Sequence, residues 1–130
     1  MKTANFDIKK RYAVLTIKWC KKNFGVNERK RTKLKFIFSK RPRKMQKQSV
    51  FGVYCFYKNK IVLYEPNCKS LYDIVSTTIH EYTHYLQSRT QYKKYEKTHF
   101  YSTNPLEREA KKNEKKYTRN CLNYIKRSIN

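Results

Sequence analysis

Two histidines that flank an acid, in the segment His80-Glu81-Tyr82-Thr83-His84, are the residues best suited to chemistry. Residues four apart lie on one face of an α-helix, so both imidazoles can reach a single ion. Glu81 is rotated by about 100° from His80 on such a helix, so its carboxylate can reach an attacking water without replacing a ligand. These residue types at this spacing predict a Zn²⁺ site in which Glu81 acts as the general base.

A catalytic zinc ion usually has three protein ligands and a water, and the candidates for the third ligand lie downstream of the motif. Our first choice is Glu107, the second is Glu109 and the third is His99. Both glutamates also suit simpler roles. Glu107 fits the third position of a helix as a capping acid, and Glu109 could pair with Lys112 or Lys116.

The motif must be carried by a helix that packs against other elements. Ser70 and Asp73 form a capping-box pattern that opens an apolar period, and the histidines fall on the opposite side of that helix. The apolar stripe consists of Leu71, Val75, Thr78, Ile79, Tyr82 and Leu86. One face of this helix is therefore expected to meet a sheet and the other face a different element.

The whole chain of 130 residues and 16.0 kDa is predicted to form one α+β domain. We expect a helix, three strands in a mostly antiparallel sheet, the active-site helix and a C-terminal helix. We expect residues 1–10 to lie loosely on the surface and residues 91–103 to form a polar connection. The elements are a helix over 11–23, strands over 33–38, 50–57 and 61–64, a helix from 70 to about 88–90, and a helix that starts at 104–105.

The charge of the chain is extreme, because 32 Lys and Arg against 9 Asp and Glu give a formal net charge of +23. The first 60 residues hold 19 of the basic residues and two of the acids. Such a surface favours a polyanion such as nucleic acid or an anionic membrane face. An AT-rich genome, which enriches Lys, Asn and Tyr, would explain the same composition. The candidate nucleic-acid-binding residues in the basic loops are Arg29, Lys30, Arg31, Lys40, Arg41, Arg43 and Lys44.

Other classes of protein are disfavoured by what the sequence lacks. No apolar run approaches the roughly 20 residues that span a bilayer, and no apolar signal-peptide core follows Met1. We therefore expect a cytoplasmic or otherwise intracellular protein. A viral, phage or organellar origin is compatible with this expectation. The four cysteines match no zinc-finger spacing and are expected to be buried free thiols.

The motif His80-Glu81-x-x-His84, followed by Glu107-x-x-Ala110, resembles the gluzincin type of zinc metallopeptidase. It is similar to the small HtpX-like and ImmA/IrrE-like zincin families, in which a later helix supplies a glutamate as third ligand. The strand hairpin that precedes the motif helix resembles the small zincin core, including that of SprT-like proteins. The resemblance of the motif makes Glu107 the ligand, whereas Lys111 stands where those families carry an acid or an amide. It implies a minimal zincin-like fold, one Zn²⁺ and the hydrolysis of peptide bonds.

The same resemblance implies further parts of a peptidase site. A donor to the tetrahedral oxyanion is required, and the candidates are His99 and Tyr101, with Tyr92 and Tyr95 as alternatives. A peptide or protein substrate is expected to add to a strand near the cleft, either 50–57 or 61–64. The rival hypothesis is a basic nucleic-acid- or particle-associated binding protein that uses a catalytically inactive zincin fold.

Overall fold

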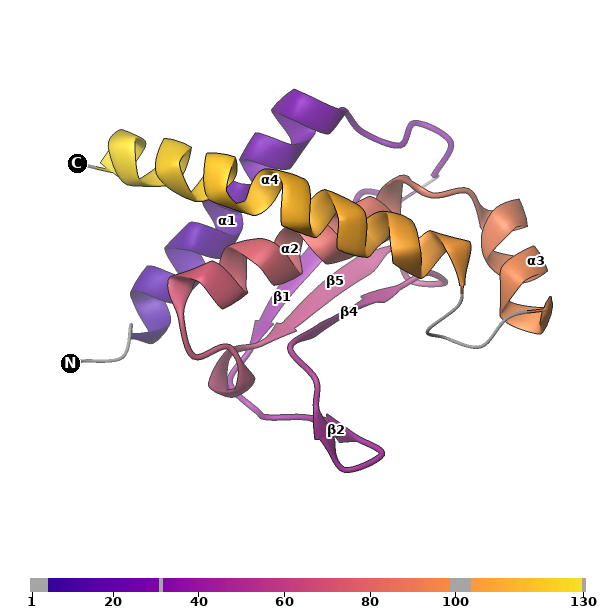
Figure 1. Cartoon of the computed structure of the whole chain (residues 1–130), viewed down its shortest axis with the longest axis horizontal. Helices are drawn as coiled ribbons and strands as arrows, with labels where there is room; N and C mark the ends of the chain where they lie inside the picture. The colour runs from indigo at the N-terminus through magenta and orange to yellow at the C-terminus, as the bar shows by residue number, and fades with distance from the viewer. Residues whose placement is uncertain (1–4, 31, 99–103, 130) are drawn as a thin grey trace.

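The structure is a computed structural model that describes residues 5–30, 32–98 and 104–129. Its α-helices and strands follow one another along the chain as Figure 1 shows. They are α1 (Phe6–Phe24), β1 (Lys35–Ser39), β2 (Lys44–Met45), β3 (Gln48–Ser49), β4 (Gly52–Cys55), β5 (Lys60–Tyr64), a short 3-10 turn (Glu65–Asn67), α2 (Leu71–Leu86), α3 (Arg89–Thr98) and α4 (Pro105–Ile129). The chain is thus α+β, as predicted.

The main sheet has three strands in the order β1-β5-β4, so β5 is central and β4 lies at an edge. β4 pairs with β5 antiparallel, whereas β1 pairs with β5 parallel, with Phe36 opposite Ile61. A separate antiparallel hairpin joins β2 and β3 within the segment that we expected to be a basic loop. Over the two sheets of the described residues, two of the three pairings are antiparallel, as expected, and the parallel one is that of β1 with β5.

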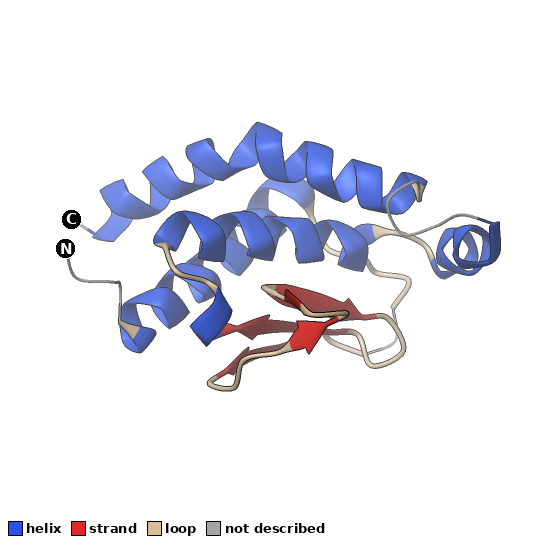
Figure 2. Cartoon of the chain, turned by 60° about the horizontal axis from the view of Figure 1, so that its bottom comes forward, coloured by secondary structure: helices blue, strands red, loops and turns tan. Residues whose placement is uncertain are grey.

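Helix α2, which carries the histidine motif, is the central element of the fold. It lies between the sheet and α4, with α1 beside it (Figure 2). Ser70 Oγ accepts a hydrogen bond from the backbone N–H of Asp73 at 3.1 Å, so the predicted N-terminal cap is present. Because α2 meets neighbours on several sides, every residue from Ile74 to Thr83 is buried.

The hydrophobic core is formed where α2 meets its neighbours. It contains Ile61 and Leu63 of the central strand and Val75, Ile79 and Tyr82 of α2, all of them fully buried. Three of the four cysteines are buried and none forms a disulfide. No helix in the described part of the chain is long and apolar enough to cross a membrane.

Two expectations about the local structure are wrong. Residues 6–10 are not loose but form the first turns of α1, because Asn5 Oδ1 caps the helix at Ile8 N and Phe6 packs on Phe38. Residues 91–98, which we expected to belong to a polar connection, instead lie in α3 (Arg89–Thr98). Its Tyr92 stacks on Phe56 with ring centroids 4.7 Å apart. This tertiary contact stabilises a helix whose own sequence has only a weak apolar pattern.

Candidate metal centre

The two histidines of the motif lie side by side on α2, as the spacing predicts. Their ring centroids are 5.1 Å apart. Ligating atoms of His80, Glu81 and His84 all lie within 4.8 Å of one another. The side chain of His80 is 11% exposed and that of His84 is 18% exposed, so both imidazoles are largely removed from solvent.

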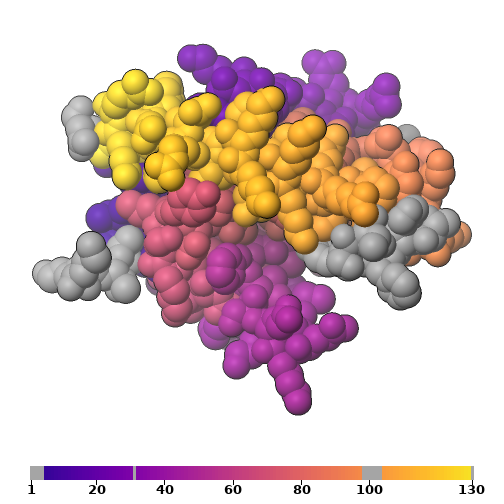
Figure 3. All heavy atoms as spheres, in the orientation of Figure 1, coloured from indigo at the N-terminus to yellow at the C-terminus, as the bar shows by residue number. Residues whose placement is uncertain are grey.

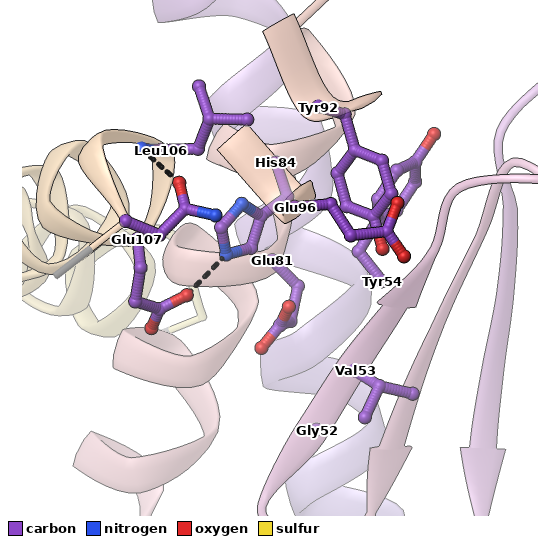
Figure 4. Close-up of a pocket in the computed structure, with 10 residues that line it drawn as sticks. Gly52, Val53, Tyr54, Glu81, His84, Tyr92, Glu96, Leu106 and Glu107 are labelled. Atoms are coloured by element: carbon purple, nitrogen blue, oxygen red, sulfur yellow. Dashed lines mark hydrogen bonds and ion pairs between the residues drawn. The ribbon is translucent and has the colours of Figure 1, made fainter. Parts of the chain in front are cut away.

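Glu107 completes the cluster from the first turn of α4. Its Oε1 lies 2.7 Å from Nε2 of His80, and its Oε2 lies 2.9 Å from Nε2 of His84. One carboxylate therefore bridges the two imidazoles. Figure 4 shows its contact with His84. The structure brings this glutamate, rather than Glu109, to both histidines. His99, our third candidate, lies outside the described residues.

The outer nitrogen of each imidazole also has a partner. His80 Nδ1 lies 2.9 Å from Oε1 of Glu114, and His84 Nδ1 lies 2.7 Å from Oε1 of Gln87. The Gln87 amide is itself oriented, because its Nε2 donates to Oε1 of Glu109 at 2.8 Å and to a backbone carbonyl. Glu109 thus contacts His84 only through Gln87, whose side chain it positions by accepting a hydrogen bond.

Glu114 is a site residue that the sequence analysis missed. It lies seven residues after Glu107, which is two helical turns, so both carboxylates project from one face of α4. That spacing was the available signal. Carboxylates that bind the second nitrogen of a metal-binding histidine fix its orientation and its tautomer. Glu114 contacts His80 in the manner of such a carboxylate.

The hydrogen bonds determine which ring nitrogen carries the lone pair when each histidine is neutral, the form that binds a metal. An ionised Glu114 only accepts, so a neutral His80 places its proton on Nδ1 and directs the Nε2 lone pair at Glu107. His84 does the same, because the Gln87 oxygen accepts from its Nδ1. Two lone-pair atoms that face each other at 2.7 to 2.9 Å repel unless a proton or a metal ion lies between them. The donor set of two imidazoles and a carboxylate is one that Zn²⁺ prefers.

The ionisation of the cluster is set by the contacts between the histidines and the carboxylates, and without a metal the cation that His80 holds is a proton. Burial would lower the pKa of His80, but hydrogen bonds to Glu107 and Glu114 outweigh burial and raise this pKa to about 10. Burial opposes ionisation of Glu107, yet its hydrogen bonds to both histidines hold the pKa of this carboxyl far below its usual range. Glu81 lacks such partners, and burial raises its pKa to about 7.

Acidic residues gather at this centre in a chain that has few of them. Five of the nine acids in the sequence line the adjacent pocket or contact the histidine network. They are Glu81, Glu96, Glu107, Glu109 and Glu114. In a chain with a formal charge of +23, this concentration of negative charge is a local reversal that favours a bound cation.

A pocket of about 310 Å³ opens beside the histidines, between α2, α3, α4 and the edge strand β4 (Figure 4). Glu81 and His84 line one wall, and Gly52 and Tyr54 of β4 line the facing wall. Of the two strands considered for peptide binding, β4 borders the pocket at an edge, whereas β5 is the central strand.

The candidate oxyanion donors are only partly described. Tyr92 of α3 lines the pocket. Tyr95 is not among the residues that line it. His99 and Tyr101 lie outside the described residues.

The basic loops lie at opposite ends of the sheet and do not form one surface. Arg29 and Lys30 precede β1, whereas Lys40, Arg41, Arg43 and Lys44 follow it. The β2–β3 hairpin, which begins at Lys44, projects from the body of the protein (Figure 3). Arg31 lies outside the described residues.

The chain matches no protein-family profile, no curated protein sequence and no solved structure.

Proposed function

We propose that this protein is a zinc-dependent metallopeptidase of minimal zincin type. In this proposal His80, His84 and Glu107 hold one Zn²⁺, and Glu81 is the general base. The observation that carries it is the Glu107 carboxylate, which lies within 2.9 Å of Nε2 of both histidines while both Nδ1 atoms are bound to other acceptors. Acceptors at all four ring nitrogens mean that each Nε2 shares a cation with Glu107, which is a proton in the metal-free protein and which Zn²⁺ would displace on binding.

Zinc held there would supply Lewis acidity, which lowers the pKa of water and polarises a scissile carbonyl. Glu81 moves the proton. Its carboxylate takes one proton from water as the water oxygen bonds to the carbonyl carbon, and then passes that proton to the amide nitrogen as the C–N bond breaks. The second water proton stays on the new carboxyl group until the amine takes it up, so the products are a carboxylate and an ammonium group. Its place in the pocket, beside His84 and free of a direct hydrogen bond to either histidine in the described structure, suits this role.

The edge strand supports a peptide as the substrate. Phe51 O accepts from Tyr64 N at 2.9 Å, and the register pairs Gly52 with Leu63. Because inward and outward backbone groups alternate along an antiparallel strand, the N–H and C=O groups of Gly52 and Tyr54 face away from β5. An extended peptide can pair with them and lie across the pocket that Glu81 lines.

The proposal is tested by comparing Glu81→Gln with the native protein. Gln keeps the size of the side chain but cannot take up the proton, so zinc content is expected to be retained while cleavage of a casein-type substrate falls by at least about a hundredfold. Zinc is measured by mass spectrometry and hydrolysis by fluorescence of a labelled substrate. Cleavage by Glu81→Gln at the native rate would remove Glu81 from the mechanism.

The ligand assignment has a matched pair of variants. Glu107→Ala removes a carboxylate that touches both imidazoles, whereas Glu109→Ala removes one that touches only Gln87. Zinc content is expected to fall much more in the first variant. The reverse order would move the third ligand to Glu109. Stoichiometric zinc without hydrolysis of any peptide would favour the rival hypothesis of an inactive zincin-like binding protein.

A further inference from the structure

A second pocket, of about 500 Å³, lies at the end of the sheet where the basic loop before β1 meets the turn between β4 and β5. Its lining contains three cations, Arg29, Lys30 and Arg89, and no acid. Two aromatic and two polar residues complete it. They are Phe56, Tyr57, Thr32 and Asn59. This volume is typical of a small-molecule site.

The three cations have no salt bridge with an acid among the described residues. Lys30 is held in place all the same, because its Nζ donates to the Tyr54 hydroxyl at 2.6 Å and lies 4.1 Å from the centre of the Phe56 ring. Burial lowers the pKa of Lys30 to about 8, and no carboxylate in the described chain offsets that cost. An anion bound in the pocket would give these cations the negatively charged partner that the described residues do not provide.

The pocket is built on an anchored frame. Asn27, which begins the basic loop, is bound through its backbone N–H and its side chain to Tyr85 of α2. On the other side, the buried Asn59 donates to the backbone carbonyl of Thr32 at 2.7 Å and accepts from the Tyr54 hydroxyl at 2.6 Å. The positions of Arg29 and Lys30 are therefore fixed by the fold and not by chance on a loose loop.

The aromatic residues indicate what kind of anion fits. Tyr57 is 70% exposed, the highest value among the large hydrophobic side chains described. The Arg89 guanidinium lies over its ring, 5.8 Å from the centroid. An exposed ring with cations beside it is the arrangement on which an unpaired base stacks while its phosphate is neutralised. An acidic peptide would use the cations but would leave the ring without a partner.

We propose that this pocket binds single-stranded nucleic acid, with a phosphate among Arg29, Lys30 and Arg89 and a base stacked on Tyr57. The two pockets are separated by a shared wall. Tyr54 lines the first pocket, and its hydroxyl accepts a hydrogen bond from Lys30 of the second pocket. Tyr92 also lines the first pocket, and its ring stacks on Phe56 of the second pocket. A bound strand would thus lie beside the pocket that holds Glu81. The inference does not depend on the proposed peptidase activity.

The test is the binding of a fluorescein-labelled oligothymidylate of about four nucleotides, measured by anisotropy across a salt series. This length is the lower end of known single-strand sites and keeps one strand from reaching both basic loops. Arg29→Ala/Arg89→Ala is expected to weaken binding by at least about tenfold and to reduce the slope of log K against log salt by about 0.7, the value for one phosphate on a single strand. The matched control Arg41→Ala/Lys44→Ala removes the same charge at the other end of the sheet and is expected to change affinity less than about threefold.

Stacking is tested separately from charge. Tyr57→Ala is expected to weaken binding by about tenfold, the scale of one lost base stack, and Tyr57→Phe to restore it. Tyr72→Ala, which removes another exposed tyrosine, serves as the control and is expected to bind as the native protein does. All measurements are repeated with a zinc chelator, so that a failure of the metal proposal leaves this one testable.

Three results would overturn the inference. Equal loss in the two double variants would show diffuse attraction to a basic protein. If Tyr57→Ala bound with native affinity, no base would stack on Tyr57. Equally tight, equally variant-sensitive binding of a poly-glutamate peptide would assign the pocket to acidic peptides instead.

Discussion

Replacement of Glu114 by Gln isolates the effect of orienting a histidine from the effect of binding the metal directly. The Glu114 carboxylate touches Nδ1 of His80 at 2.9 Å and lies on the side of the ring away from Glu107. Gln keeps the length of the side chain but replaces a charged acceptor by a neutral amide. The variant should therefore retain all the zinc ligands while it loosens the tautomer and the orientation of one of them.

The expected magnitude follows from the contact and its exposure. Loss of a residue that supports a metal-binding histidine costs 10- to 100-fold in metal affinity. The Glu114 side chain is 34% exposed, so water can replace part of the lost hydrogen bond. We therefore expect the lower end of that range, about tenfold, which corresponds to about 1.4 kcal/mol of zinc binding free energy.

The assay is competition for zinc between the protein and a chromophoric chelator at fixed pH and salt. Glu96→Gln is the matched control, because Glu96 lines the same pocket but has no hydrogen bond or ion pair with either histidine in the described structure. Both variants remove one negative charge near the ion. The control is expected to lose less than about threefold, since only screened, longer-range attraction is affected.

Two results would refute this reasoning. Unchanged zinc affinity in Glu114→Gln would show that the Nδ1 contact does not position His80. Equal losses in Glu114→Gln and Glu96→Gln would show that the net charge of the pocket matters and the hydrogen bond does not. Thermal unfolding of the zinc-free variants separates either result from a general loss of structure.

Three further outcomes follow from the packing and the metal site. Gly52→Ala should lower the free energy of unfolding by about 1 to 3 kcal/mol in urea denaturation, because a Cβ would lie 2.7 Å from side-chain atoms of Leu63 and Thr77; an unchanged midpoint would contradict this tight packing. Tyr82→Phe should cost about 1 kcal/mol, since its buried hydroxyl donates to Gly25 O at 2.6 Å, and a cost below a few tenths would show that this bond contributes little. Free zinc at a hundred times its Kd should stabilise the native protein by about 2.7 kcal/mol in thermal unfolding but should not stabilise Glu107→Ala; equal stabilisation of both would argue against this ligand.

Local patterns in the sequence predicted the elements that carry the site. The cap at Ser70 and the apolar period after it gave the helix α2 nearly to its ends, because both signals act within a few residues. α3 was missed because its residues are polar and its main support is the contact between Tyr92 and Phe56, which the chain brings together from distant positions. The parallel pairing of β1 was missed for the same reason, since strand order is a non-local property.

The choice between Glu107 and Glu109 shows where sequence reasoning stops. Successive helical residues are about 100° apart, so each glutamate is about 100° from one of the buried residues Leu106 and Ala110 and about 60° from the other. The two acids thus flank the apolar stripe of α4 almost symmetrically. Only the side from which α2 approaches selects Glu107 for the histidines and leaves Glu109 to Gln87.

The sequence by itself determined that His80 and His84 share one helix face, because a spacing of four residues is a local property of any α-helix. It also determined the excess of positive charge, which no fold can change. The tertiary structure decided which carboxylates reach the imidazoles, since Glu107 and Glu114 lie on a helix more than 20 residues away whose rotation is set by its packing on α2. It likewise decided that the basic loops are separate, because the length of β1 holds them at opposite ends of the sheet.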